Sequence, residues 1–250
     1  MRFQGKVLFA TGGGSGIAAE VARRFTAEGG RVAVVDLDEV GAKAVAADID
    51  GAIALACDVS NEDSVKRAVR SAAEQLGGLD CVFNAGGHAD FGPLEEWSLT
   101  RWNKMLGVHA GGTFLVSKHA LPHLRARGGG AIVNVASVAA FVAQRGNAPY
   151  GAAKAAIAGF TRQLALEVGP EIRVNCIAPG RTQTGMTEPL MAARGGGDVA
   201  KGAEVFGQGN IQKRVAAASE LAAAVCFLLS DDASFVTGST MVVDGGEIVT

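Results

Sequence analysis

The chain has 250 residues, of which 48% are hydrophobic and 19% are charged, so it can bury a sizeable core and is unlike a disordered segment. Its 35 glycines follow no Gly-x-y period and are accompanied by only 6 prolines, which excludes a collagen-like or proline-rich chain. The 23 basic and 25 acidic residues give a net charge of −2 without any run of like charges, and this balance argues against a nucleic-acid partner.

The N-terminal segment has only four consecutive apolar residues before a glycine cluster, too few for a signal peptide or a membrane span. The cysteines lie far apart in apolar surroundings and form no Cys-x-x-Cys pair, so we expect buried free thiols in a reducing compartment; they are Cys57, Cys81, Cys176 and Cys226. His119 and His123 share a helix face but have no third ligand, so no metal site is expected. We therefore predict a soluble, cytoplasmic protein that does not associate with membranes.

Seven short and nearly continuous apolar runs follow one another along the chain, as is typical of strands buried on both faces. They span residues 6–11, 31–36, 52–58, 79–85, 131–137, 172–178 and 240–244. Longer segments between them are patterned for helices, at residues 15–28, 38–49, 60–76, 98–127, 149–168 and 219–229. Repeated strand–helix–strand units predict an α/β fold, with a doubly wound parallel sheet and helices on both faces, in a single domain over residues 1–250.

Some helix ends carry explicit signals. Ser60 is expected to be the N-cap of the third helix, with Asp63 three residues later, and Gly77-Gly78 to end that helix. Gly29-Gly30 is expected to end the first helix.

Residues 181–215 show no clear pattern and are too many for a simple connection. Loops of this length are usually lids or binding loops, so a substrate lid is expected here. A disordered surface insertion is the alternative.

A glycine-rich loop connects the first strand to the first helix, with the sequence TGGGSGIA over residues 11–18. Glycines let backbone N–H groups approach a pyrophosphate, and the helix N-terminus adds unsatisfied donors and the positive end of its dipole. Because strand, glycines and helix come in the required order, the loop predicts a dinucleotide site; its expected contacts are Gly12, Gly14, Ser15, Gly16 and Ile17.

Asp36 ends the second strand, 20 residues after Gly16, where a carboxylate can bond both ribose hydroxyls of an adenosine. Leu37 is a further expected cofactor contact. A 2′-phosphate at this position would meet a like charge, and neither Leu37 nor Ser15 supplies a cation to neutralise it. The sequence therefore favours NAD over NADP.

Tyr150, the only tyrosine, is four residues before Lys154 in PYGAAKAAIAGF, so both side chains share one helix face. Ser137 ends the fifth strand, at the sheet edge where ligands of this fold bind. Together they indicate general acid–base catalysis on an alcohol or carbonyl. Acting near neutral pH requires the phenol pKa to fall by about three units. An ammonium ~6 Å away would contribute roughly 3 kcal/mol toward this, and an oxidised nicotinamide would add a second nearby cation.

The set TGGGSGIA, Asp58-Val59, NAGG at 84–87, Ser137, Tyr150-x-x-x-Lys154 and PGRTQT at 179–184 resembles the short-chain dehydrogenase/reductase family over nearly the full chain. The resemblance implies a Rossmann-like seven-stranded sheet, hydride transfer with NAD(P) and a homotetramer. It implies that Tyr150 is the general acid–base, that Ser137 polarises the substrate oxygen, and that Lys154 binds the nicotinamide ribose and lowers the phenol pKa. Further cofactor contacts are implied at Asp58, Val59, Asn84, Ala85, Gly86, Pro179, Gly180, Thr182 and Thr184.

Two positions depart from the family pattern. Ala18 replaces a glycine of the loop, a mild change because that glycine mainly permits close helix–strand packing. His109 stands where the family has a catalytic asparagine. Histidine could relay protons, or it could fill the space with its ring bonded to backbone, and the sequence leaves both open.

We predict from these features an NAD-dependent enzyme that interconverts a secondary alcohol and a ketone. The alternatives are an NADPH-dependent reductase of 3-oxoacyl thioesters and a weakly catalytic dinucleotide-binding regulator. Arg145 or Arg181 could bind an acidic group of the substrate. The other candidates for the substrate pocket are His88, Asp90, Phe91, Val142, Gln144, Met186, Leu190, Met191 and Phe206.

Overall fold

The apolar runs of the sequence form one sheet of seven parallel strands, and the central strands are buried on both faces. The computed structural model describes residues 1–250. The strands are β1 (Val7–Thr11), β2 (Arg31–Asp36), β3 (Ile53–Ala56), β4 (Cys81–Asn84), β5 (Gly130–Val135), β6 (Ile172–Pro179) and β9 (Thr240–Val243). Their order is β3-β2-β1-β4-β5-β6-β9, so the winding reverses between β1 and β4. The predicted doubly wound α/β fold is confirmed.

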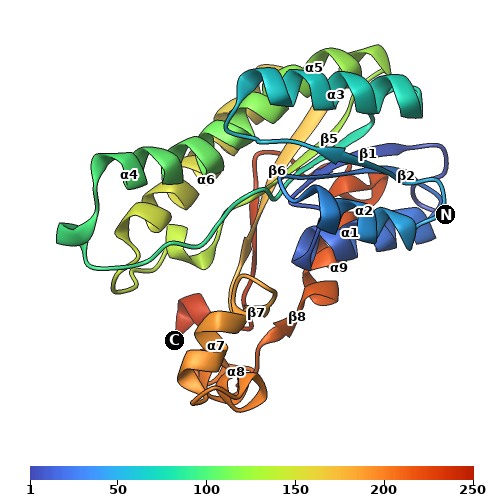
Figure 1. Cartoon of the computed structure of the whole chain (residues 1–250). Coiled ribbons are helices and arrows are strands. Elements are labelled where there is room, and N and C mark those ends of the chain that lie inside the picture. The colour runs from blue at the N-terminus through green and yellow to red at the C-terminus, as the bar shows by residue number, and fades with distance from the viewer.

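Helices cover both faces of this sheet (Figure 1). One core lies under α1 (Gly16–Ala27), α2 (Glu39–Ala47) and α9 (Ala218–Leu229). The other lies under α3 (Glu62–Leu76), α5 (Gly112–Ala126) and α6 (Ala148–Val168). No helix combines the length and the apolarity needed to cross a membrane.

The start of α3 differs from the prediction by one residue. Asn61, and not Ser60, is its N-cap, and its side-chain oxygen accepts a hydrogen bond from the Ser64 N–H at 2.9 Å. Ser60 is otherwise engaged, because its hydroxyl donates to Asp58 Oδ1 at 2.6 Å. The predicted end is confirmed, since Gly77 adopts the left-handed conformation that glycine favours, with φ of 77°.

The long helix expected over residues 98–127 is continuous but not uniform. It consists of α4 (Leu99–Leu106), one π-helical turn at Gly107–Gly111, and α5. A π turn adds a residue to the helical repeat and re-aims the side chains that follow, and such turns occur often at functional sites. His109 lies at the centre of this turn.

Residues 181–215 are ordered, which overturns the alternative of a disordered insertion. They contain β7 (Thr182–Gln183), α7 (Glu188–Arg194) and α8 (Val199–Gly207), and β7 pairs with β8 (Ala216–Ala217) just beyond. Asp198 caps α8 by accepting hydrogen bonds from the N–H groups of Ala200 and Lys201. These helices pack together at the end of the molecule away from α3 and α5 (Figure 1).

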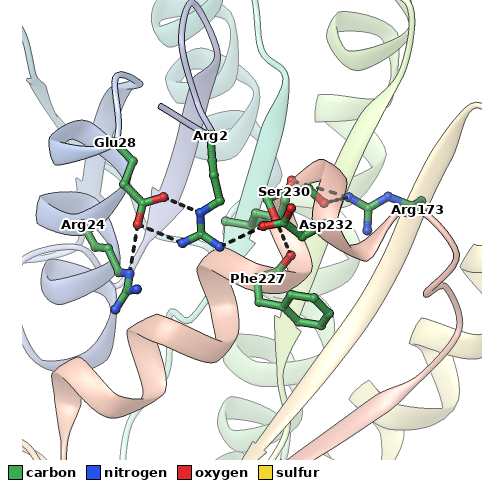
Figure 2. Close-up of polar contacts among 8 residues, drawn as sticks. Arg2, Arg24, Glu28, Arg173, Phe227, Ser230 and Asp232 are labelled. Carbon is green, nitrogen blue, oxygen red and sulfur yellow. Dashed lines mark hydrogen bonds and ion pairs between the residues drawn. The ribbon is translucent and has the colours of Figure 1, made fainter.

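Two arginines tie the C-terminal part of the chain to the sheet layer (Figure 2). Arg2 bonds Glu28 at the end of α1 and contacts Asp232 after α9. Arg173 on β6 donates to the carbonyl oxygens of Leu228 and Ser230, both at 2.8 Å. Those carbonyls are at the C-terminal end of α9, where no helical N–H is left to bond them.

Replacement of this arginine, Arg173→Met, should lower the free energy of unfolding by about 2–3 kcal/mol, because the terminal carbonyls of α9 lose charged donors in a partly buried place. Urea unfolding measures the change. Arg125→Met is the matched control, since Arg125 makes only a largely exposed ion pair with Glu171 and should cost less than about 1 kcal/mol. Equal losses in the two variants would contradict the capping role of Arg173.

Candidate active site

A cavity of about 420 Å³ opens at the carboxyl edge of the sheet, where the strand order reverses. In this architecture ligands bind at that position. The predicted residues on its wall are Gly12, Ser15, Gly16, Ile17, Asp36, Leu37, Asp58, Val59, Ala85, Gly86, His88, His109, Ser137, Tyr150, Lys154, Pro179, Gly180, Thr182, Thr184 and Met186.

The glycine loop brings backbone donors to one end of the cavity. Gly12 has φ of 67°, and a Cβ there would lie 2.8 Å from the carbonyl oxygen of Ala85, so only glycine fits. Ser15 precedes α1 but makes no side-chain cap, and the first turn contains no acid. The N–H groups of this turn are therefore available to an anion, as a pyrophosphate requires.

Asp36 is fixed at the same end by the backbone around it. Its two carboxylate oxygens accept hydrogen bonds from the Gly14 N–H at 2.9 Å and the Asp38 N–H at 3.0 Å. Gly14 itself is not on the cavity wall; it holds Asp36 instead. The donors, the close backbone approach and the carboxylate fit the phosphates and a ribose of a dinucleotide.

Ser137, Tyr150 and Lys154 lie together on another part of the wall. Ser137 leads into a short 3₁₀ turn, and its oxygen accepts a hydrogen bond from the Ala139 N–H at 3.2 Å. Because the oxygen is the acceptor there, the Ser137 hydroxyl proton is free to be donated into the cavity. Lys154 Nζ donates to the carbonyl oxygen of Val135 at 2.9 Å and lies 5.5 Å from the centre of the Tyr150 ring.

Burial dominates the electrostatics of these groups. It lowers the pKa of Lys154 to about 8, and it raises the pKa of Tyr150, an effect that the neighbouring Ser137 opposes. The sequence argument expects a lowered phenol pKa from the charge of Lys154 together with that of an oxidised nicotinamide. The protein's own groups alone shift the pKa of Tyr150 the other way.

His109 is 1% exposed, with its Nε2 at 2.9 Å from the carbonyl oxygen of His88. Burial, together with the charge of Lys154, lowers the pKa of His109 to about 3. Its ring is therefore neutral at physiological pH. Of the two roles left open by the sequence, these contacts favour the ring bonded to backbone over a proton relay.

Several predicted residues lie elsewhere. Asn84 is buried, and its amide donates to Ser117 Oγ at 3.1 Å and Asn134 Oδ1 at 2.9 Å, so it faces the helix layer and not the cavity. The guanidinium of Arg181 pairs with Glu247 at 3.1 Å and bonds the Phe206 carbonyl, so it is not free to bind a substrate acid.

The remaining substrate candidates are also off the main cavity wall. Met191 is fully buried, and Phe206 lies against the guanidinium groups of Arg181 and Arg194. Asp90 is bound by Arg101, and Val142 and Gln144 line a separate hollow of about 260 Å³. The others away from the wall are Phe91, Arg145 and Leu190.

Sequence reasoning missed several residues on the wall, namely Ala18, Cys57, Gly87, Lys104, Val108, Val135, Ala136 and Thr187. Most of these residues are next in the sequence to a predicted residue, so the signal that could have found them is adjacency to a strand end. Lys104 carried no such signal, because it lies in the interior of α4.

Comparison with known proteins supports an oxidoreductase. Residues 12–247 match the family model described as enoyl-(acyl carrier protein) reductase. The chain is 37% identical to levodione reductase of Leifsonia aquatica over 98% of this chain and 95% of that one. It is 38% identical to D-threitol dehydrogenase of Mycolicibacterium smegmatis over 98% and 94% of the two chains.

Solved structures agree with this relationship. A crystal structure of levodione reductase superposes with a TM-score of 0.93 at 36% identity, covering 100% of both chains. Aldohexose dehydrogenase of Thermoplasma acidophilum superposes with a TM-score of 0.92 at 29% identity, covering 99% of this chain and 95% of that one.

The substitution Lys154→Met should remove a pH-dependent penalty on folding. The pKa of Lys154 falls from an ordinary 10.5 to about 8 on folding, so below pH 8 the folded state holds a costly buried charge. That cost disappears as the pH rises from about 8 to 10.5, because the folded state releases its proton first. The wild type should therefore gain up to about 3 kcal/mol relative to the variant across this window, measured by urea unfolding. A stability difference that is the same at every pH would refute the depressed pKa.

Proposed function

Because the chain belongs to the short-chain dehydrogenase/reductase family, we propose that it is an NAD-dependent oxidoreductase that interconverts a secondary alcohol and a ketone. One observation carries the proposal. A single cavity joins a backbone-lined anion site and Asp36 to the wall that holds Ser137, Tyr150 and Lys154. The first part suits a dinucleotide, and the second suits proton transfer at a carbon–oxygen bond.

Each side chain has a role in this chemistry. A nicotinamide held beside these residues would supply the acceptor or donor of the hydride. Tyr150 donates its phenol proton to the ketone oxygen, or in the reverse direction takes the proton of the alcohol. Ser137 donates a hydrogen bond to the same oxygen with the hydroxyl proton that Ala139 leaves free. Lys154, fixed by Val135, supplies the positive charge near the phenol.

The raised pKa of Tyr150 suits proton donation, because a neutral phenol is what carbonyl reduction requires. Alcohol oxidation requires the phenolate instead. We infer that the positive charge of an oxidised nicotinamide, added to that of Lys154, stabilises the phenolate for oxidation.

The cofactor preference follows from the carboxylate of Asp36. It is held by two backbone N–H groups at the cavity end, so it cannot turn away from a 2′-phosphate. Leu37, the next residue, is 74% exposed and offers no charge to neutralise one. This arrangement favours NAD and opposes the NADPH-dependent thioester reductase that was the sequence's alternative.

The relatives and the cavity wall both bear on the class of substrate. The relatives' names refer to levodione, D-threitol and an aldohexose, which are small oxygenated molecules. The wall here combines His88, Lys104 and Met186 near the catalytic side chains. We infer a small, oxygenated alcohol or ketone, with the segment of residues 181–215 closing one side as a lid through Thr184, Met186 and Thr187.

The variant Tyr150→Phe should lower kcat by about 10²–10⁴-fold, since it removes the only phenol and with it the proton donor. Activity is measured as the change in NADH absorbance over a panel of small ketones, diols and sugars. Binding of NADH, followed by its fluorescence, should persist and is the control for folding. Equal turnover in both proteins would exclude the catalytic role of Tyr150. That outcome would favour the alternative of a weakly catalytic dinucleotide-binding regulator.

The wild type should use NADH in preference to NADPH, and Asp36→Asn should narrow that preference at least about tenfold by removing the like-charge repulsion. The ratio of kcat/KM for the two cofactors measures it. Asp38→Asn is the matched control, because Asp38 caps α2 and is not on the cavity wall. A wild-type preference for NADPH would overturn the cofactor assignment.

A further inference from the structure

His109 makes its contacts with the chain segment that follows β4. The π-helical turn at Gly107–Gly111 aims its ring at this segment, where Nε2 lies 2.9 Å from the carbonyl oxygen of His88. The ring centres of His88 and His109 are 5.3 Å apart. The other ring nitrogen of His109, Nδ1, is buried without a hydrogen-bond partner, so Nε2 alone fixes the ring.

Gly87 is shaped to this ring. A Cβ added at Gly87 would lie 2.5 Å from Cε1 and 3.0 Å from Nδ1 of His109, closer than real Cβ contacts come. The backbone of Gly87 therefore lies directly against the imidazole. No larger residue fits at position 87 unless the ring moves.

The catalytic phenol makes two aromatic contacts here, one with this segment and one with His109. Phe91 is 47% exposed and meets the Tyr150 ring edge-on, with centres 5.9 Å apart. His109 meets that ring at 5.5 Å and 85°. Tyr150 thus contacts both His109 and a residue of the segment that His109 bonds.

The charges around His109 favour a neutral ring. Lys154 on α6 and His88 on the bonded segment both oppose a positive charge on it, and Tyr150 is the remaining titratable group in contact. A neutral imidazole has one N–H. Nε2 of His109 lies 2.9 Å from the carbonyl oxygen of His88 and 3.3 Å from the backbone nitrogen of the same residue, and the shorter contact, which needs a donor on the ring, favours the proton on Nε2.

We propose that His109 is a positioning residue, whose Nε2–H holds the segment from Gly87 to Phe91 against Tyr150 and so sets the part of the cavity wall that Gly87 and His88 form. In this role it neither gives nor takes a proton during turnover. The inference rests on the proposed function in the tests that measure turnover, and is independent of it in those that measure stability or the histidine tautomer.

Two substitutions of His109 test which ring nitrogen its role depends on. His109→Gln places an amide donor near the position of Nε2, whereas His109→Asn reaches only to the position of Nδ1. We expect His109→Gln to keep kcat/KM within about twofold and His109→Asn to raise KM about tenfold with a smaller change in kcat. The inflections of the pH profile of kcat should be the same in all three proteins. Better activity in the asparagine variant, or an inflection lost in the glutamine variant, would overturn the proposal.

The fit of Gly87 supplies a second test that needs no turnover. Gly87→Ala should clearly lower the urea midpoint of unfolding in the wild type but hardly at all in a His109→Ala background, because the clash has then gone. Gly159→Ala is the matched control, since a Cβ there meets nothing within 4 Å. Equal effects of Gly87→Ala in both backgrounds would contradict the close fit.

The tautomer can be read directly by long-range ¹H–¹⁵N spectroscopy of the histidine rings, with the His109→Gln variant used to assign the signal. We expect His109 to stay neutral with its proton on Nε2 from about pH 5 to about pH 9. Titration in this range, or a proton on Nδ1, would overturn the proposal. If the wild type oxidised no alcohol, the proposed function would fail, while the tautomer and the Gly87 coupling would still decide the role of His109.

Discussion

The sheet reverses its winding between β1 and β4, and the helices that follow these two strands depart to opposite faces. Neither helix can cover the carboxyl edge at that point, so the backbone opens into a cavity there. Several components of the candidate site lie at this edge of the sheet. The glycine loop follows β1, Asp36 ends β2, the segment from Ala85 to His88 follows β4, and Ser137 follows β5.

Burial at this edge raises the pKa of Tyr150 and lowers the pKa values of Lys154 and His109. It stabilises the uncharged forms of Tyr150, Lys154 and His109 together, so the protein alone does not prepare a phenolate. Within the proposed mechanism, the charge needed for alcohol oxidation therefore arrives with the oxidised cofactor. Such an arrangement couples the readiness of the catalytic phenol to the occupancy of the neighbouring dinucleotide site.

Much of the fold could be predicted because strands and helices are indicated by the spacing of residues along the chain. Apolar runs fix strands, and the spacing of Tyr150 and Lys154 fixes a shared helix face wherever the helix lies. The hydrogen-bond partner of a side chain cannot be predicted from this spacing. Ser60 and Asn61 are both good caps, and only the structure shows that Asp58 engages the serine. Likewise, a strand-end asparagine such as Asn84 can face either side, and a buried Ser117 decides which.

Residues 181–215 were difficult for a related reason. Their helices have only seven and nine residues, too few turns for an apolar period to stand out. Arg181 looked available from the sequence, but its partner Glu247 lies 66 residues away, beyond the reach of any local pattern. The sequence could name His109 as unusual, but its protonation depends on burial beside Lys154, which only the fold creates.

The contact between Gly87 and His109 also constrains how such a site can evolve. A histidine introduced at position 109 while position 87 carried a side chain would bring its Cε1 within 2.5 Å of that side chain's Cβ, so the ring would have to move. A glycine introduced first would leave only a small gap. Of the two mutational orders, the one that begins with glycine avoids this overlap, and once histidine has followed, a return to a larger residue at position 87 would displace the ring.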